Sequence, residues 1–149
     1  MRKIQFLFLL MALMLVPVAS SCEEIEKEDS CEVSETKWDN VIDALIQVES
    51  GGRLNAKRGS SVGVLQITPI LVAECNNIMR RNNDRRRFTL NDRYSYEKSK
   101  EMFILLQDHF NKSGNVEKAV KSWNLGFYNR GYRDKGRKYY QKFLRYYKD

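Results

Sequence analysis

The sequence is poor in the residues on which nucleophilic and metal-dependent enzymes rely. It contains one histidine, His109, and three cysteines, none in a CxxC pair or in a His/Cys spacing typical of a metal site. Catalysis by Ser/His or Cys/His pairs is excluded because His109 has neither a second histidine nor a suitable nucleophile as partner. We therefore expect His109 to be a surface or packing residue, and we expect no metal or cofactor.

The chain also lacks an apolar run long enough to be read as a membrane span. Its longest run, IQFLFLLMALMLVPV, follows the basic start MRK and is broken by Pro17, whereas a span needs about 20 apolar residues. A basic start, a short apolar run and then small residues are typical of a secretory signal that is removed. Residues 1–21 are therefore predicted to be a signal peptide.

The segment ASSC, which ends at Cys22, resembles the lipobox of bacterial lipoproteins. The resemblance implies that Cys22 is lipidated, and that the protein is exported and anchored to a membrane, in the outer membrane or facing the periplasm. An ordinary signal peptide and a single transmembrane anchor are the alternatives. Residues 22–35 carry seven acids and one lysine, so we expect an acidic, flexible tether.

The charge of the remaining chain is strongly positive. The whole sequence carries +7; residues 1–21 carry +2 and residues 22–35 carry −6, so residues 36–149 carry +11. A basic domain predicts an anionic partner, and export leaves cell-wall polymer and anionic lipid rather than nucleic acid. The basic run at residues 80–87 lacks the interleaved aromatic residues of nucleic-acid modules. We expect a monomer that binds peptidoglycan.

Residues 36–149 read as one mainly α domain. Apolar periodicity and capping signals predict about five helices, at residues 36–50, 68–79, 95–114, 115–126 and 137–148. Thr36 is the expected cap of the first. Residues 53–67 are predicted to form an ordered loop that contains a short strand pair. Cys31 and Cys75 either form a disulfide or remain free thiols.

Glu49 lies on the wrong face for a solvated acid. It follows Leu45 by one turn and Ile46 by three residues, so it projects on the apolar stripe of its helix. An apolar environment disfavours the carboxylate and raises its pKa, which suits a general acid near neutral pH. The alternative is an edge glutamate that turns out to solvent.

Four stretches, ESGGRLNA, GVLQITP, AVKSWNLG and YYQKFL, occur in the order found in the SLT family of lytic transglycosylases, which the chain resembles over residues 38–147. The resemblance implies a lysozyme-like fold and cleavage of peptidoglycan. Glu49 would protonate the oxygen between N-acetylmuramic acid and N-acetylglucosamine, and would then accept the proton of the muramic C6 hydroxyl as a 1,6-anhydro end forms. Tyr139 would orient Glu49.

The same resemblance implies substrate-binding roles for four further residues. Ser50 would bind the muramyl substituents, and Gln66 and Asn124 would bind the N-acetyl and ring groups. Trp123, which stands where the family usually has tyrosine, would stack on a sugar. Structural alternatives are a loop brace for Gln66, a helix-end cap for Asn124 and packing against Val120 for Trp123.

Two other functions compete with this one. A hydrolytic muramidase would need a second carboxylate some 5–10 Å from the first, for which Asp84 and Asp92 are the candidates. A non-catalytic peptidoglycan-binding lipoprotein would keep the fold as a scaffold.

Overall fold

The computed structural model describes residues 37–129 and 135–148, all within the unit Ser34–Asp149. The predicted signal peptide and tether, with Cys22 and Cys31, lie outside the described residues, as does Thr36. The described chain is mainly α-helical with one short strand pair, as predicted. No helix in it has the length and hydrophobicity that crossing a bilayer requires.

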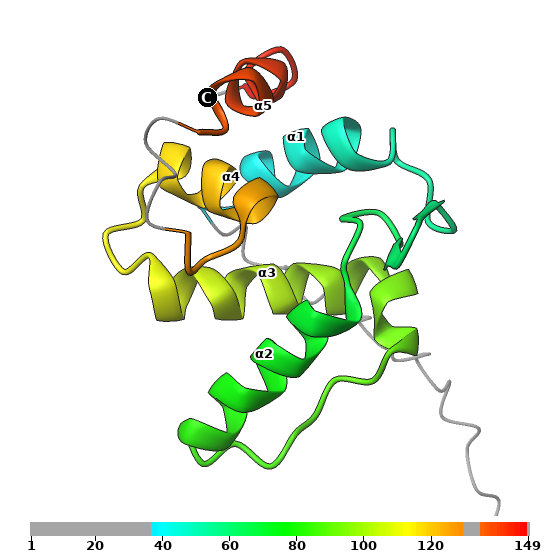
Figure 1. Ribbon diagram of the computed structural model, residues 1–149, viewed down its shortest axis with the longest axis vertical. Helices are drawn as coiled ribbons and strands as arrows, with labels where there is room; N and C mark the ends of the chain where they lie inside the picture. The colour runs from blue at the N-terminus through cyan, green and yellow to red at the C-terminus, as the bar shows by residue number, and fades with distance from the viewer. Residues whose placement is uncertain (1–36, 130–134, 149) are drawn as a thin grey trace, which may run out of the picture. The chain divides into compact units, whose positions relative to one another are not determined.

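Figure 1 shows the order of the elements along the chain. They are α1 (Asp39–Glu49), β1 (Lys57–Arg58), β2 (Ser61–Val62), α2 (Pro69–Arg81), the 3₁₀ helix η1 (Asn91–Tyr94), α3 (Tyr96–Phe110), α4 (Val116–Leu125) and α5 (Arg137–Phe143). The two strands are antiparallel, with Lys57 opposite Val62 and Arg58 opposite Ser61.

Three helices begin at polar caps. The side chains of Thr68, Ser95 and Asn115 each accept a hydrogen bond from the backbone N–H three residues on, at the starts of α2, α3 and α4. Pro69 occupies the first turn of α2, where its missing N–H costs nothing. These starts follow from local chemistry, and the sequence predicts them.

Four predicted helix boundaries are wrong, one of them the end of α2, which runs to Arg81 instead of Met79. The N-cap of α1 is Trp38, without a side-chain hydrogen bond. Helix α3 stops at Phe110, since the Asn111 amide bonds the backbone carbonyl of Asn115 at 2.8 Å and turns the chain. Helix α5 ends at Phe143, where the bonding changes: the N–H groups of Arg145 and Tyr146 donate to carbonyls three residues back, although Tyr147 N–H still donates to Phe143, four residues back.

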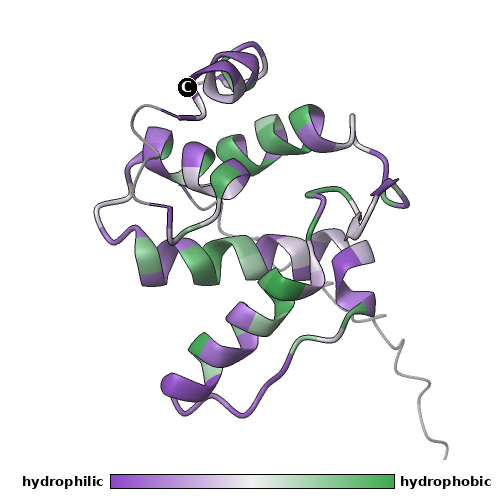
Figure 2. Cartoon of the chain, viewed as in Figure 1, coloured by the Kyte–Doolittle hydropathy of each residue, from purple (hydrophilic) through white to green (hydrophobic). Residues whose placement is uncertain are grey.

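The core lies between α1, α3 and α4. Trp38 contacts Phe103 edge-on at 5.7 Å between ring centroids, and Phe103 contacts Trp123 at 5.2 Å. Helix α1 packs against α4 and α5, and α2 packs against α3. Figure 2 shows the hydrophobic residues on α1, along α3 and at the start of α2, whereas the end of α2 and the following segment are hydrophilic.

Cys75 is a free thiol in this core. It is fully buried, and burial raises its pKa to about 12. For Cys75, the free-thiol alternative of the sequence reading therefore holds, and the buried thiol is unsuited to nucleophilic chemistry.

Candidate functional site

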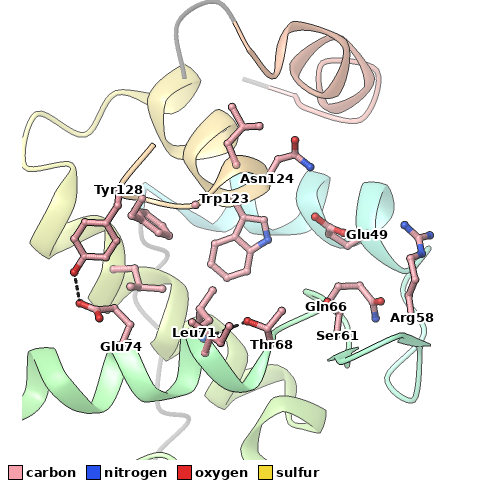
Figure 3. A pocket seen from close by; sticks show the side chains of 15 residues that line it. Glu49, Arg58, Ser61, Gln66, Thr68, Leu71, Glu74, Trp123, Asn124 and Tyr128 are labelled. Atoms are coloured by element: carbon pink, nitrogen blue, oxygen red, sulfur yellow. Dashed lines mark hydrogen bonds between the residues drawn. The ribbon is translucent and has the colours of Figure 1, made fainter. Parts of the chain in front are cut away.

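One cavity of about 460 Å³ brings together the end of α1, the strand pair, the start of α2 and the end of α4 (Figure 3). Its wall combines polar and apolar side chains, as ligand sites do. The residues that line it are Glu49, Arg58, Ser61, Gln66, Thr68, Ile70, Leu71, Glu74, Leu106, Trp123, Asn124, Leu125, Gly126, Phe127 and Tyr128.

Glu49 is the last residue of α1 and lies on the cavity wall. Burial raises the pKa of its carboxyl group. The hydrogen bond from Tyr139 and the charges of Arg58 and Lys142 oppose that rise. The net effect is upward, so a larger fraction of Glu49 holds a proton near neutral pH than for a solvated glutamate. A carboxyl group in this state can both give and take a proton.

Tyr139 reaches Glu49 from α5. Its hydroxyl donates a hydrogen bond of 2.5 Å to Glu49 Oε1, the contact that the family resemblance implies. Burial, and then the charge of Glu49, raise the pKa of Tyr139, so its hydroxyl stays protonated and remains a donor. Lys142 Nζ also donates to the carbonyl of Val48 at 3.0 Å. These two bonds connect helix α5 to the end of α1 at Val48 and Glu49.

Gln66 lines the cavity and braces the loop that precedes it. Its Nε2 donates to the carbonyls of Ala56 and Gly63, at 3.1 and 2.9 Å. The backbone of Gln66 has φ +50°, which non-glycine residues rarely adopt. The bracing alternative is thus confirmed, and Oε1 is the atom left to accept a hydrogen bond from a ligand.

Trp123 and Asn124 lie at the end of α4, and both line the cavity. The half-buried Trp123 ring packs against Phe103 and Phe127, at 5.2 and 6.4 Å between centroids, so it belongs to the core as well as to the wall. Asn124 is exposed. The helix cap is Gly126, with φ +87°, so the capping alternative for Asn124 is wrong.

Ser50 does not lie on the cavity wall. Only 3% of its surface is exposed, and its hydroxyl donates to the carbonyl of Ile46 at 3.3 Å. The predicted contact with muramyl substituents is therefore not available to Ser50 in this structure. The role was assigned by motif position, whereas the hydroxyl is turned toward the Ile46 carbonyl, which also accepts the backbone N–H groups of Ser50 and Gly51.

Both predicted second carboxylates lie off the cavity. The neighbouring Arg86 holds Asp84, through side chain and backbone, and lowers the pKa of its carboxyl. Asp92 accepts a hydrogen bond of 2.6 Å from the backbone N–H of Thr89. Asp84 lies in the segment between α2 and η1, and Asp92 lies in the first turn of η1, so neither reaches the cavity.

Glu74, which is not among the residues predicted from the sequence, is the second carboxylate of the cavity. Its Oε1 accepts hydrogen bonds from Tyr128 at 2.7 Å and Arg81 at 3.3 Å. Figure 3 shows it on the far side of Trp123 from Glu49. Its place on the wall depends on how α2 packs, for which the sequence holds no local signal.

Arg93 supports the loop that carries Arg58 and Gln66. It is nearly buried and donates to the carbonyls of Leu90, Ser60 and Ile67, at 2.8, 3.1 and 3.3 Å. In a basic chain a single arginine reads as a solvated charge, so the sequence does not reveal this role.

Within residues 37–129 and 135–148, no group of three or more His, Cys, Asp or Glu side chains could hold an ion. His109 packs edge-on against Phe110 at 4.6 Å between ring centroids and is not on the cavity wall.

No protein-family model, curated protein or solved structure matches the chain.

Tyr139→Phe should weaken any proton transfer at Glu49. A misplaced reacting group costs on the order of 10- to 100-fold in rate, and loss of a bond that lowers the Glu49 pKa should raise that pKa further. In the pH profile of kcat/KM, the limb that corresponds to loss of the Glu49 proton should therefore move to higher pH. Tyr146→Phe, on an exposed tyrosine, is the matched control. An unmoved limb in Tyr139→Phe would contradict the role of this hydroxyl.

Proposed function

We propose that this protein is a peptidoglycan lytic transglycosylase with a lysozyme-like fold. The observation that carries the proposal is the partly buried Glu49 on a cavity wall, its carboxyl oxygen held by Tyr139. A single carboxyl group so placed can act as acid and then as base. The mixed cavity, with an indole, two amides and hydroxyl groups, suits a sugar chain.

In the proposed reaction, Glu49 gives its proton to the glycosidic oxygen between N-acetylmuramic acid and N-acetylglucosamine. The bond from that oxygen to the muramic C1 breaks, and the C6 hydroxyl of the same sugar bonds to C1. The hydroxyl proton passes to the Glu49 carboxylate, which restores the starting state. The products are a 1,6-anhydro-muramyl end and a free N-acetylglucosamine end. Tyr139 holds the carboxyl oxygen in place through both steps.

The position of the second carboxylate favours this reaction over hydrolysis by a muramidase. Two-carboxylate glycosidases place both groups on either side of the scissile bond. Asp84 and Asp92 are off the cavity, and Glu74 is held by Tyr128 and Arg81 on the other side of Trp123. An internal hydroxyl needs no activated water and therefore no second base.

We propose further that the protein is exported and acts as a monomer on glycan strands, with a lipid on Cys22 as its anchor. The support is the N-terminal pattern ending in ASSC and the charge of +11 on residues 36–149. Nucleic acid is not an expected partner. Fatty-acid labelling of the full chain that persists in Cys22→Ser would contradict the anchor.

Mass spectrometry of the muropeptides released by the chain without residues 1–21 tests the proposed function. We expect anhydro-muramyl ends. Reducing muramyl ends would make the protein a muramidase, and binding of sacculi without release of fragments would make it a non-catalytic wall-binding protein.

A further inference from the structure

Arg58 is the one arginine on the cavity wall among the described residues. It ends strand β1 and lies beside Ser61 and Gln66, on the same side of the cavity as Glu49 (Figure 3). Lys57 precedes it, and successive side chains of a strand point to opposite faces. Lys57 is exposed and does not line the cavity, so of two adjacent cations only Arg58 faces a ligand there.

The guanidinium of Arg58 has no ion-pair partner in the described part of the chain. Two other exposed arginines do: Arg81 pairs with Glu74 and Arg86 with Asp84. The acid whose pKa Arg58 affects is Glu49, which must be uncharged to give up its proton. In the reactive state, therefore, a cation stands in the cavity without a counter-charge from Glu49.

A substrate with an anionic group near the scissile bond would supply that counter-charge. The muramyl sugar carries a lactyl group on C3, the second carbon from the bond that breaks. In peptide-free glycan this group is a carboxylate, whereas in peptide-bearing glycan it is a neutral amide. The fork of an arginine matches a carboxylate with two parallel hydrogen bonds.

We propose that Arg58 binds the free lactyl carboxylate of peptide-free muramyl residues and so selects stripped glycan as the substrate. This inference rests on the proposed function and names the substrate class of the same site. Binding of the carboxylate also offsets the charge of Arg58, which otherwise lowers the pKa of Glu49. The favoured substrate thereby helps to keep the acid protonated.

Calorimetry with two synthetic glycan tetrasaccharides tests the proposal. One carries free lactyl carboxylates, and in the other each carboxylate is a neutral methylamide. The binding protein is Glu49→Gln, alone and combined with Arg58→Gln, Arg58→Lys or Lys57→Gln. Because binding is measured without turnover, the result does not depend on which reaction the enzyme performs.

We expect Glu49→Gln to bind the carboxylate form about tenfold more tightly than the amide, the order of a charge-assisted hydrogen bond. Adding Arg58→Gln should bring the ratio of the two affinities, carboxylate form over amide form, to about one, mainly through weaker binding of the carboxylate form. Arg58→Lys should keep part of the preference, since it keeps the charge but loses the fork. Lys57→Gln also removes one positive charge, from the neighbouring residue that does not line the cavity, and should keep the full affinity ratio.

Equal binding of both forms by Glu49→Gln would overturn the proposal, and so would a preference that survives Arg58→Gln or falls equally in Lys57→Gln. Failure of the proposed function shows differently, as reducing ends or no fragments in the product analysis. The thermal midpoint of each variant, expected to be unchanged for these exposed positions, excludes unfolding as the cause.

Discussion

Glu49→Gln should reduce the release of anhydro-muropeptides by about 10²–10⁴-fold, the usual contribution of general acid–base catalysis. One carboxyl group performs both proton transfers in the proposed reaction, so the upper end is expected. The amide keeps the volume of the side chain and can still accept the hydrogen bond of Tyr139. Binding of glycan and the fold should therefore survive, and only the bond-breaking step should be lost.

The same substitution should leave the fold as stable or make it more stable. Burial raises the pKa of Glu49 above its ordinary value of 4.5. The unfolded chain releases this proton near pH 4.5, whereas the folded protein holds it up to the raised pKa. Between these two pKa values the free energy of unfolding therefore falls as pH rises. Glutamine does not titrate. The thermal midpoint of Glu49→Gln, relative to the native chain, should therefore increase from acid to neutral pH.

Two carboxylate variants serve as controls. Asp92→Asn should retain activity, because Asp92 lies off the cavity and bonds Thr89. Glu74→Gln should cost far less than Glu49→Gln, because Glu74 lies beyond Trp123. If Glu74→Gln were as inactive as Glu49→Gln while still folded, two carboxylates would share the chemistry. If Glu49→Gln retained near-native release of anhydro ends, the mechanism would fail.

Gly63→Ala should destabilise the domain by about 2–5 kcal/mol. Gly63 has φ +79°, and a Cβ built there would lie 1.8 Å from the backbone carbonyl oxygen of Arg93. A left-handed conformation costs an alanine about 1–2 kcal/mol, and overpacking adds about 1–3 kcal/mol. Backbone cannot move aside as a flexible side chain can. Urea unfolding measures the effect as a shift of the unfolding midpoint, with the dependence of the free energy of unfolding on urea concentration unchanged.

Gly59→Ala is the matched control for this loss. Gly59 also has a left-handed backbone, φ +60°, but nothing lies within 4 Å of the added Cβ. It should cost only about 1–2 kcal/mol for the conformation. Equal losses in both variants would mean that the close approach of the loop to η1 contributes nothing. A larger loss in Gly63→Ala should be accompanied by weaker glycan binding, because the loop presents Arg58 and Gln66 to the cavity.

The sequence by itself determined the mainly α fold, the strand pair and the starts of three helices. Each cap bond joins residues three positions apart, as from Leu71 N–H to Thr68, so a short stretch contains both donor and acceptor. The position of Glu49 on an apolar stripe is equally local, since helix geometry sets it against Leu45 and Ile46. The predicted helix ends were less accurate, because contacts made by the residues that follow a helix decide where it stops.

Only the tertiary structure decided which side chains share the cavity. Tyr139 meets Glu49 across 90 residues of sequence, and that hydrogen bond depends on how α5 packs against α1. Packing also placed Glu74 and Arg58 on the wall, and it buried Ser50 at the end of α1. Patterns along a chain fix which face of an element is apolar. Which faces meet is set by close packing between elements distant in sequence, and such packing leaves no periodic signal at the residues that it brings together.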